Sequence, residues 1–237
     1  MHTRDEATRP VLPAAGLTLG IRFAGSTALV SGDSSVKALA SAGLAGMRTT
    51  LRRMRTSAGG GVVVAQFHEL GAARFFDPSL HELFGSITPL SDIASRPLLA
   101  EIEERLAGAA THAARAGLVD EFLCRSFRER SDDALVREAA RVIRRTHGVV
   151  RIGALARDLG ISQDALEKRF RRVAGASPKQ LASIARFRSV VAGFERGETL
   201  TALAHRAGYF DQSHLIREFR SFTGEAPEAF LSARLHC

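Results

Sequence analysis

The stretch AHRAGYFDQSHLIREFRSFTGEAP, which runs from Ala204 to Pro227, has the pattern of a helix, a tight turn and a second helix. Gly208 stands where the turn between two helices needs a positive φ, which glycine adopts at no steric cost. Asp211 or Ser213 can then cap the second helix by accepting an orphan backbone N–H. The residues that give this helix one apolar face are Leu215, Phe219 and Phe222. The stretch therefore predicts a helix-turn-helix unit.

An earlier stretch of the chain repeats this pattern. The matching residues are Ala156, Gly160, Leu166, Phe170, Gly175 and Pro178 in the first copy, and Ala204, Gly208, Leu215, Phe219, Gly224 and Pro227 in the second. The offset is 48 residues before the turn and 49 from the leucine onward, so one copy has an extra residue in its turn. The repeat predicts two helix-turn-helix units in one chain.

The repeated pattern resembles that of the AraC/XylS family of bacterial transcription regulators. The family signature is an alanine, a Gly-aromatic turn, an apolar residue, a basic residue and Phe, and then Gly-x-x-Pro. The second copy matches it through Ala204, Gly208-Tyr209, Leu215, Arg217, Phe219-Arg220, Gly224 and Pro227. The resemblance covers roughly residues 132–230 and implies a sequence-specific DNA-binding transcription regulator.

A second resemblance lies nearer the N-terminus, in VVVAQFHELGAARFFDPSLHELFGSITPLSDI at residues 62–93. This segment is similar to the N-terminal sensor-like module of one branch of the same family, in which a β-hairpin precedes the matching motif. The matching residues are Gly71-Ala72-Ala73, Phe75-Phe76, Pro78 and His81-Glu82-Leu83-Phe84. The resemblance implies a sensor-like domain and names no ligand.

We expect an α+β fold with two domains, at residues 1–129 and 130–237. The C-terminal domain is expected to be all-α. Its parts are a first helix-turn-helix unit at 151–174, a long linking helix at 178–195 and a second unit at 199–223. Ser131, followed by Asp132 and Asp133, is expected to start the helix that leads into this domain, because a cap and two acids suit a helix N-terminus.

The N-terminal domain is expected to hold a small antiparallel sheet or partial barrel at 17–76, followed by helices at 97–128. Alternating apolar residues predict a strand at 17–24, and two β-like runs on either side of Gly59–Gly61 predict a hairpin. Residues 1–16 are polar and then punctuated by proline and glycine, which predicts a loose segment.

The net charge of +8 is unevenly distributed along the chain. Residues 1–129 contain 14 basic and 13 acidic residues, whereas residues 130–237 contain 19 and 12. Many proteins are mildly basic without binding nucleic acid. Here the excess coincides with the repeated helical units, as a DNA-binding domain requires.

The second helix of a helix-turn-helix enters the major groove, and two units can occupy segments about 34 Å apart, one helical turn. The resemblance implies base contacts from Gln212, Ser213 and Arg217 in the second unit, and from Gln163, Asp164, Glu167 and Lys168 in the first. Phosphate contacts are expected from Arg171, Arg172 and Arg220. Arginine can bond guanine, and glutamine adenine, through paired hydrogen bonds.

The two acids of the first unit leave two interpretations open. Asp164 and Glu167 can accept hydrogen bonds from cytosine N4, although a carboxylate repels phosphate. In the alternative, they pair with Arg171 or Lys168 on the helix surface. We therefore expect the second unit to provide more of the sequence discrimination, and the first to provide mainly position and phosphate contacts.

The family resemblance favours a regulator whose N-terminal domain binds a small-molecule effector. A pocket for it would be lined by Val62, Val64, Phe67, Phe75 and Phe76, although apolar alternation of this kind is also typical of ordinary core. The alternative is a ligand-free DNA-binding scaffold that is regulated by its abundance or by a protein partner.

An enzyme or a metal site in the N-terminal domain is the remote alternative. The eight histidines form neither a His-Glu-x-x-His motif nor a cluster with metal-ligand spacing. Gly59–Gly61 lacks the continuation of a phosphate-binding loop. We expect no catalytic residue, no cofactor and no metal.

The remaining expectations concern location and partners. Cys124 and Cys237 form no disulfide framework, which fits a reducing cytoplasm. The segment MHTRDEATRP lacks the apolar core of a signal peptide, and no run approaches the roughly 20 apolar residues of a membrane span. The expected partner is double-stranded DNA, and no membrane association is expected. The resemblance also admits an effector, RNA polymerase and a homodimer, formed through the helices at 97–128 unless these pack on their own sheet.

Overall fold

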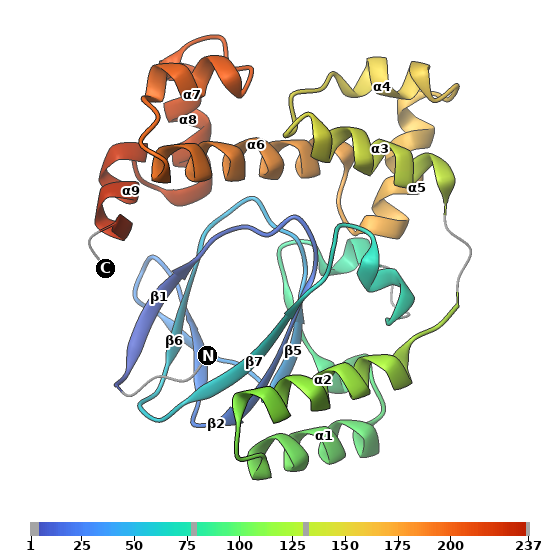
Figure 1. Ribbon diagram of the computed structural model, residues 1–237, viewed down its shortest axis with the longest axis vertical. Coiled ribbons are helices and arrows are strands. Elements are labelled where there is room, and N and C mark those ends of the chain that lie inside the picture. The colour runs from blue at the N-terminus through green and yellow to red at the C-terminus, as the bar shows by residue number, and fades with distance from the viewer. Residues whose placement is uncertain (1–4, 77–79, 130–132, 236–237) are drawn as a thin grey trace.

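Strands come first in the chain and helices follow, as Figure 1 shows. The computed structural model describes residues 5–76, 80–129 and 133–235. The helical part lies across one end of the strands, and two further helices lie against one of the sheets, away from the helical part. The expected α+β fold is confirmed.

Eight strands in the described part of the chain form two antiparallel sheets. They are β1 (Ala7–Val11), β2 (Thr18–Ala24), β3 (Thr27–Val30), β4 (Val36–Ala38), β5 (Ala42–Ala45), β6 (Arg52–Thr56), β7 (Gly61–Gln66) and β8 (Ile87–Pro89). The strand order is β1-β6-β3-β4 in the first sheet and β7-β2-β5-β8 in the second. The sheets face each other, so the chain has the partial barrel that the sequence predicts.

The hairpin predicted around the glycine run is wrong. β6 pairs with β1 and β3 of the first sheet, whereas β7 pairs with β2 of the second. The chain crosses between sheets here, beside a second crossing at Gly25. The Ser57 N–H donates to the Ser26 carbonyl at 3.0 Å, and a Cβ at Gly25 would lie 2.7 Å from the Cα of Gly60. The glycines thus let two corners pack together instead of forming one tight turn.

The prediction that the first residues are loose is wrong for β1. This strand runs antiparallel to β6, from Ala7 opposite Thr56 to Val11 opposite Arg52. Because β1 is at the edge of its sheet, Pro10 can be accommodated without breaking a central ladder. Most of its side chains are exposed, so the strand lacks the apolar alternation by which a sequence reveals one.

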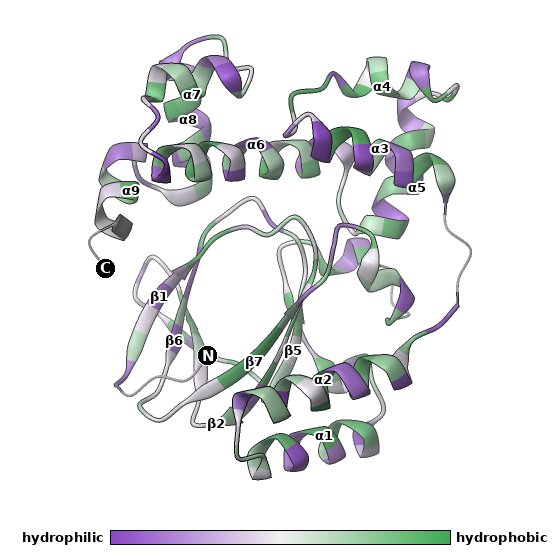
Figure 2. Ribbon diagram, in the orientation of Figure 1, coloured by the Kyte–Doolittle hydropathy of each residue, from purple (hydrophilic) through white to green (hydrophobic). Residues whose placement is uncertain are grey.

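Two helices cover the outer face of the second sheet. They are α1 (Arg96–Gly108) and α2 (His112–Ser126). Their apolar residues form one core with Leu19, Ile21 and Leu44 of the sheet; these residues are Leu99, Ile102, Leu106, Val119 and Phe122. Figure 2 shows β7 largely hydrophobic and the outward sides of both helices more polar. The apolar faces of these helices are therefore used against their own sheet.

The helical domain contains both helix-turn-helix units. Its helices are α3 (Ala134–Arg145), α4 (Ile152–Asp158), α5 (Gln163–Ala174), α6 (Pro178–Glu195), α7 (Leu200–Arg206), α8 (Gln212–Thr223) and α9 (Pro227–Leu235). The first unit is α4 and α5, the second is α7 and α8, and α6 links them. Asp133 caps α3, while the expected cap Ser131 and the neighbouring Asp132 lie outside the described residues.

The sheets and their loops contact both units of the helical domain. The Leu51 N–H donates to the carbonyl oxygen of Phe222 in α8 at 2.6 Å. At the end of α5, a Cβ on Gly175 would lie 2.6 Å from the carbonyl oxygen of Leu80. Met47 is buried in the core of the helical domain. The two parts therefore share a packed interface, and the domain boundary near residue 129 stays a prediction.

Candidate nucleic-acid interface

In each unit, the turn between the two helices depends on one glycine. Gly160 and Gly208 have φ values of 71° and 70°, a conformation that residues with a Cβ rarely adopt. The side chain of Ser162 caps α5, and that of Asp211 caps α8, by accepting backbone N–H groups at 3.1 Å and 2.7 Å. Of the two caps considered for the second unit, the structure uses Asp211. Both predicted turns are confirmed.

The exposed side of α8 carries the polar residues predicted for DNA contact in the second unit. Gln212 accepts a hydrogen bond from the Thr201 hydroxyl at 3.3 Å. Within the described part of the chain, no hydrogen bond or ion pair engages the side chains of Ser213, Arg217 or Arg220. These two guanidinium groups therefore remain available to DNA.

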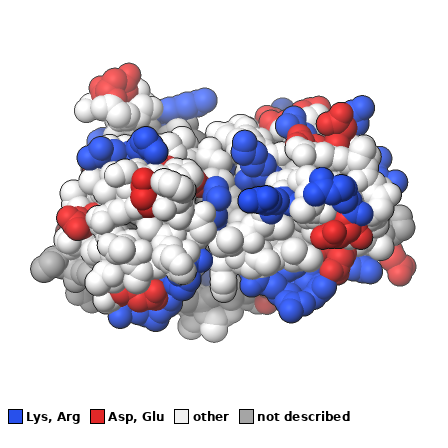
Figure 3. Space-filling view, turned by 90° about the horizontal axis from the view of Figure 1, so that it is seen from above, with Lys and Arg blue, Asp and Glu red and all other residues white. Residues whose placement is uncertain are grey.

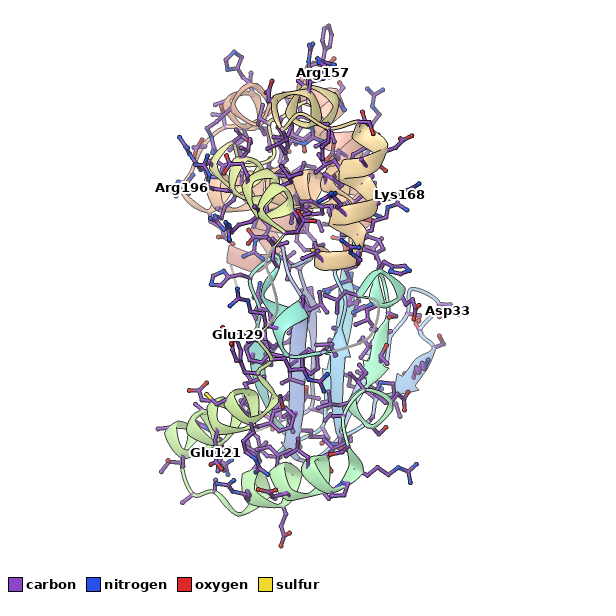
Figure 4. The ribbon with its side chains drawn as sticks, turned by 90° about the vertical axis from the view of Figure 1, so that its right-hand side faces the viewer. Asp33, Glu121, Glu129, Arg157, Lys168 and Arg196 are labelled. Atoms are coloured by element: carbon purple, nitrogen blue, oxygen red, sulfur yellow. The ribbon has the colours of Figure 1, made fainter. Side chains whose placement is uncertain are left out.

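On the corresponding side of α5, some of the polar side chains pair with one another. The Gln163 amide donates to Glu167 at 3.2 Å, and the Arg171 guanidinium lies 3.5 Å from the same carboxylate. Of the two interpretations, pairing within the helix holds for Glu167 in this structure. Asp164 lies in the first turn of α5, where the positive end of the helix stabilises a carboxylate. Lys168 is exposed and projects from the outer side of α5 (Figure 4).

The first unit also has a basic residue that turns toward α3. Arg172 lies 3.9 Å from the Asp133 carboxylate, and Arg169 lies 3.1 Å from the same group. Both arginines line a cleft between α3, α5 and the loop that follows β7. The phosphate contact expected of Arg172 stays a prediction, and it requires this arginine to leave Asp133.

A partly buried ion pair that the sequence did not indicate anchors α8 to the linking helix. Glu218 accepts from the Ser183 hydroxyl at 2.8 Å and lies 3.1 Å from the Arg186 guanidinium. The same guanidinium lies over the Tyr209 ring, 5.4 Å from its centroid. Burial, together with the Glu218 charge, raises the pKa of Tyr209. No spacing rule reveals this group, because its members come from α6, α8 and the turn between α7 and α8.

The two ends of the molecule differ in what they present. Arg157 of α4 and Glu121 of α2 lie at opposite ends (Figure 4). Figure 3 looks onto the helical domain from above, where basic side chains lie on both halves and between them, with acidic ones among them. The helices α1 and α2 are thus remote from α4, and DNA on the helical domain would leave them uncovered.

The residues predicted for a ligand pocket fall into two places. The Phe67 ring packs against two others, with centroid distances of 5.2 Å to Phe75 and 5.7 Å to Phe76. All three rings belong to the core beneath α1 and α2. Val62 and Val64 alternate with residues of that core and so point into the space between the sheets. Val64 is 57% exposed. The predicted pocket residues therefore do not line one enclosed cavity.

Two arginines, one just before β6 and one at its start, are buried. Arg48 is buried and donates to the carbonyl oxygens of Val11, Leu12 and Thr50, and burial lowers its pKa to about 10. Arg52 is 9% exposed and donates through Nη2 to the Gly85 carbonyl. Its Nη1 is buried and has no hydrogen-bond partner among the described residues. Burial lowers the pKa of Arg52 as well.

Other kinds of site were sought over the same described ranges. No group of three or more His, Cys, Asp or Glu side chains there is arranged to hold a metal ion. None of the helices in these ranges is long and apolar enough to span a membrane.

Comparisons with known proteins agree with this geometry. Residues 155–233 match the family model of a helix-turn-helix domain, and no curated protein matches the chain. The structure of ToxT from Vibrio cholerae in its P21 form is 14% identical, covers 98% of this chain and 95% of ToxT, and gives a TM-score of 0.50. ToxT bound to (E)-4-(8-methylnaphthalen-1-yl)but-3-enoic acid is 15% identical, with coverages of 98% and 96% and a TM-score of 0.50.

A third structure matches only part of the chain. It is a probable AraC family transcriptional regulator from Rhodopseudomonas palustris, 28% identical over 42% of this chain and 95% of its own, with a TM-score of 0.36. The likeness to ToxT over nearly the whole chain shows that the two proteins share a fold.

Proposed function

We propose that this protein, a DNA-binding transcription regulator of the AraC/XylS type whose residues 155–233 match a helix-turn-helix domain, reads its site mainly through α8. The observation that carries the proposal is the pair of exposed guanidinium groups, Arg217 and Arg220, that no other described residue engages. Arg217 suits paired hydrogen bonds to guanine, and Arg220 a phosphate. The helix α5 occupies the neighbouring major-groove segment and adds mainly position and backbone contacts.

Selection of bound fragments from random DNA, followed by footprinting of the selected sequence, tests this proposal. We expect two protected major-groove segments about one helical turn apart. We also expect the base preference to be sharp in one segment and weak in the other. Two equally sharp segments, or protection of one segment alone, would contradict the division of roles between α8 and α5.

The buried Nη1 of Arg52, which has no hydrogen-bond partner among the described residues, supports regulation by a small molecule. A buried guanidinium N–H without a partner is unfavourable, and an anionic group would supply the missing acceptor to Arg52. ToxT, which shares this fold, is bound in one structure to a carboxylic acid on an aromatic body. We propose that the effector of this protein also carries a carboxylate, held by Arg52, and an apolar body that lies along Val62 and Val64.

The strand that carries Arg52 also contacts the second unit. Leu51 donates its N–H to Phe222, and Arg53 pairs with Glu225 at 3.0 Å. Side chains alternate along a strand, so Arg52 faces the space between the sheets while Arg53 faces outward. An effector that binds Arg52 would therefore shift Leu51 and Arg53, the two residues that contact the C-terminal end of α8.

Thermal unfolding of the full chain with a panel of aromatic and aliphatic carboxylic acids tests the effector. We expect some acids, but not their methyl esters, to raise Tm, and Arg52→Gln to abolish the shift. Arg55→Gln is the matched control, because Arg55 lies on the opposite face of β6 and its Nε, also buried without a hydrogen bond, lies 3.4 Å from the Glu6 carboxylate; this variant should respond like the wild type. A panel without any response would favour the alternative, a ligand-free scaffold regulated by abundance or by a partner.

The proposal has consequences for the remaining partners. It assigns the chain no catalytic role and, because its target is DNA, a place in the cytoplasm. Self-association through the uncovered sides of α1 and α2 is part of the proposal, as is contact with RNA polymerase. Sedimentation of the full chain with and without DNA tests the homodimer, and a purely monomeric protein on DNA would remove it.

A further inference from the structure

The structure locates the extra residue that distinguishes the two turns. Ile161 in the first unit and Tyr209 in the second occupy the same place, since each donates its backbone N–H to the alanine five residues earlier, at 3.1 Å and 2.9 Å. The cap Ser162 follows Ile161 directly, whereas Phe210 stands between Tyr209 and the cap Asp211. Phe210 is therefore the additional residue, and the first unit has no counterpart.

This phenylalanine points away from the protein. Tyr209, its neighbour, is 8% exposed and packs edge-on against the His214 ring, with centroids 5.2 Å apart. Phe210 is 94% exposed. A ring so fully in water adds little to folding, because it removes almost no apolar surface from solvent. Its apolar surface is available for a partner.

The position of Phe210 indicates which partner this is. It lies two residues before Gln212, at the N-terminal end of the helix that enters the major groove. The major groove presents one apolar group, the C5-methyl of thymine, and phenylalanine is among the side chains that contact it. A phenyl ring has no donor for phosphate, so packing against a base is the contact that its chemistry favours.

We propose that Phe210 packs against the methyl group of a thymine in the segment read by α8, and so adds a preference for thymine that the first unit lacks. The inference rests on the proposed DNA-binding function and extends its reading surface from α8 into the preceding turn. Phe210 is thus a specificity-determining residue that acts beside Arg217 through apolar contact rather than hydrogen bonding.

The experiment uses the full chain and the DNA sequence that it selects. Each thymine in the more sharply read segment is replaced by deoxyuridine, which removes only the methyl group. At one position we expect the wild type to lose about fourfold in affinity, as for one buried methyl group. Phe210→Ala should bind the thymine and deoxyuridine forms equally, and Phe210→Leu should keep part of the difference.

Two controls separate this contact from other effects. Because Phe210 is almost fully exposed, Phe210→Ala should leave Tm unchanged. Phe127→Ala removes a partly exposed phenylalanine of the N-terminal part, and should leave the response to deoxyuridine as in the wild type.

Several outcomes would overturn the inference. These are an equal deoxyuridine response in the wild type and Phe210→Ala, a selected segment without thymine, or a variant that changes self-association and not DNA binding. In each of these cases the wild type still selects a DNA sequence, so the proposed function stands. A wild type that selects no sequence would instead remove the proposed function, and this inference with it.

Discussion

The two helix-turn-helix units share a backbone and differ in the charge of their reading helices. Both α5 and α8 have 12 residues, begin at a capping side chain and end on a glycine in the left-handed conformation. At matching places the first unit has Asp164 and Glu167 where the second has Ser213 and Ile216. The caps and glycines thus determine where each helix begins and ends, whereas the residues on its exposed side can be acidic, basic or neutral.

The comparison extends to the way each reading helix is anchored. Arg169 of α5 and Glu218 of α8 are 49 residues apart and occupy the same place in the repeat. Arg169 pairs with Asp133 at the start of α3, and Glu218 pairs with Arg186 of α6, each at 3.1 Å. One position therefore anchors both helices with opposite signs. The first unit is tied to the domain entrance, and the second to the linking helix.

The largest expected difference between the units is in the stability of these anchors. Glu218 is 16% and Arg186 27% exposed, so Glu218→Ala leaves a largely buried charge unpaired and should cost about 2–3 kcal/mol of unfolding free energy. Arg169 is half exposed, and the Asp133 that it leaves behind, although only 11% exposed, keeps Arg172 nearby and the Val136 N–H, so Arg169→Ala should cost less than about 1 kcal/mol. Urea unfolding of both variants measures the two losses.

A neutral variant provides the control for this comparison. Glu218→Gln keeps the size of the side chain and an oxygen that can accept from Ser183, and should be less destabilising than Glu218→Ala. Equal losses in Glu218→Ala and Arg169→Ala would show that the two anchors do not differ as their burial indicates.

A smaller difference is expected in DNA recognition between the matched residues Arg217 and Lys168. Arg217→Ala should lose about 1–3 kcal/mol of binding free energy and relax the preference at one base pair. Lys168→Ala should lose less and change no preference, because an ammonium group lacks the planar fork that reads guanine. Binding titrations on the selected site and its single-base variants measure both effects. A larger loss of preference in Lys168→Ala would reverse the roles of the units.

The sequence predicted the bounds of the linking helix and of both helix-turn-helix units nearly to the residue, because their signals are local. Glycine at a positive φ, a capping side chain and an apolar stripe each act within a few residues. Thus Gly208 and Gly224 mark the turns that the structure has, and Pro178 starts the linking helix. The change of offset from 48 to 49 residues also showed that one turn is a residue longer. It did not show that the extra residue is an exposed phenylalanine.

The parts that the sequence missed depend on contacts between distant residues. Nothing near Gly59 shows that the strands on its two sides belong to different sheets, because this depends on packing against the corner at Gly25. The Glu218 anchor likewise needs Ser183 and Arg186 from another helix. Arg52 resembles Arg53 and Arg55 in the sequence, and what distinguishes it is its burial, since it is 9% exposed while the other two are not buried.

The smallest expected effect concerns the acid that sets the first unit apart. Asp164→Ser gives α5 the residue that α8 carries at the matching place, and removes a carboxylate that repels phosphate. Affinity should rise about threefold for all DNA sequences alike, with a smaller effect at high salt, since the gain is electrostatic. The stability of the helix should fall by about 0.3–1 kcal/mol, because Asp164 lies at its positive end.

Asp120→Ser, which makes the same charge change on α2 at the far end of the molecule, should leave DNA binding nearly unaltered. If Asp164→Ser instead abolishes a preference at one cytosine, Asp164 reads a base, and the first unit discriminates sequence in its own right.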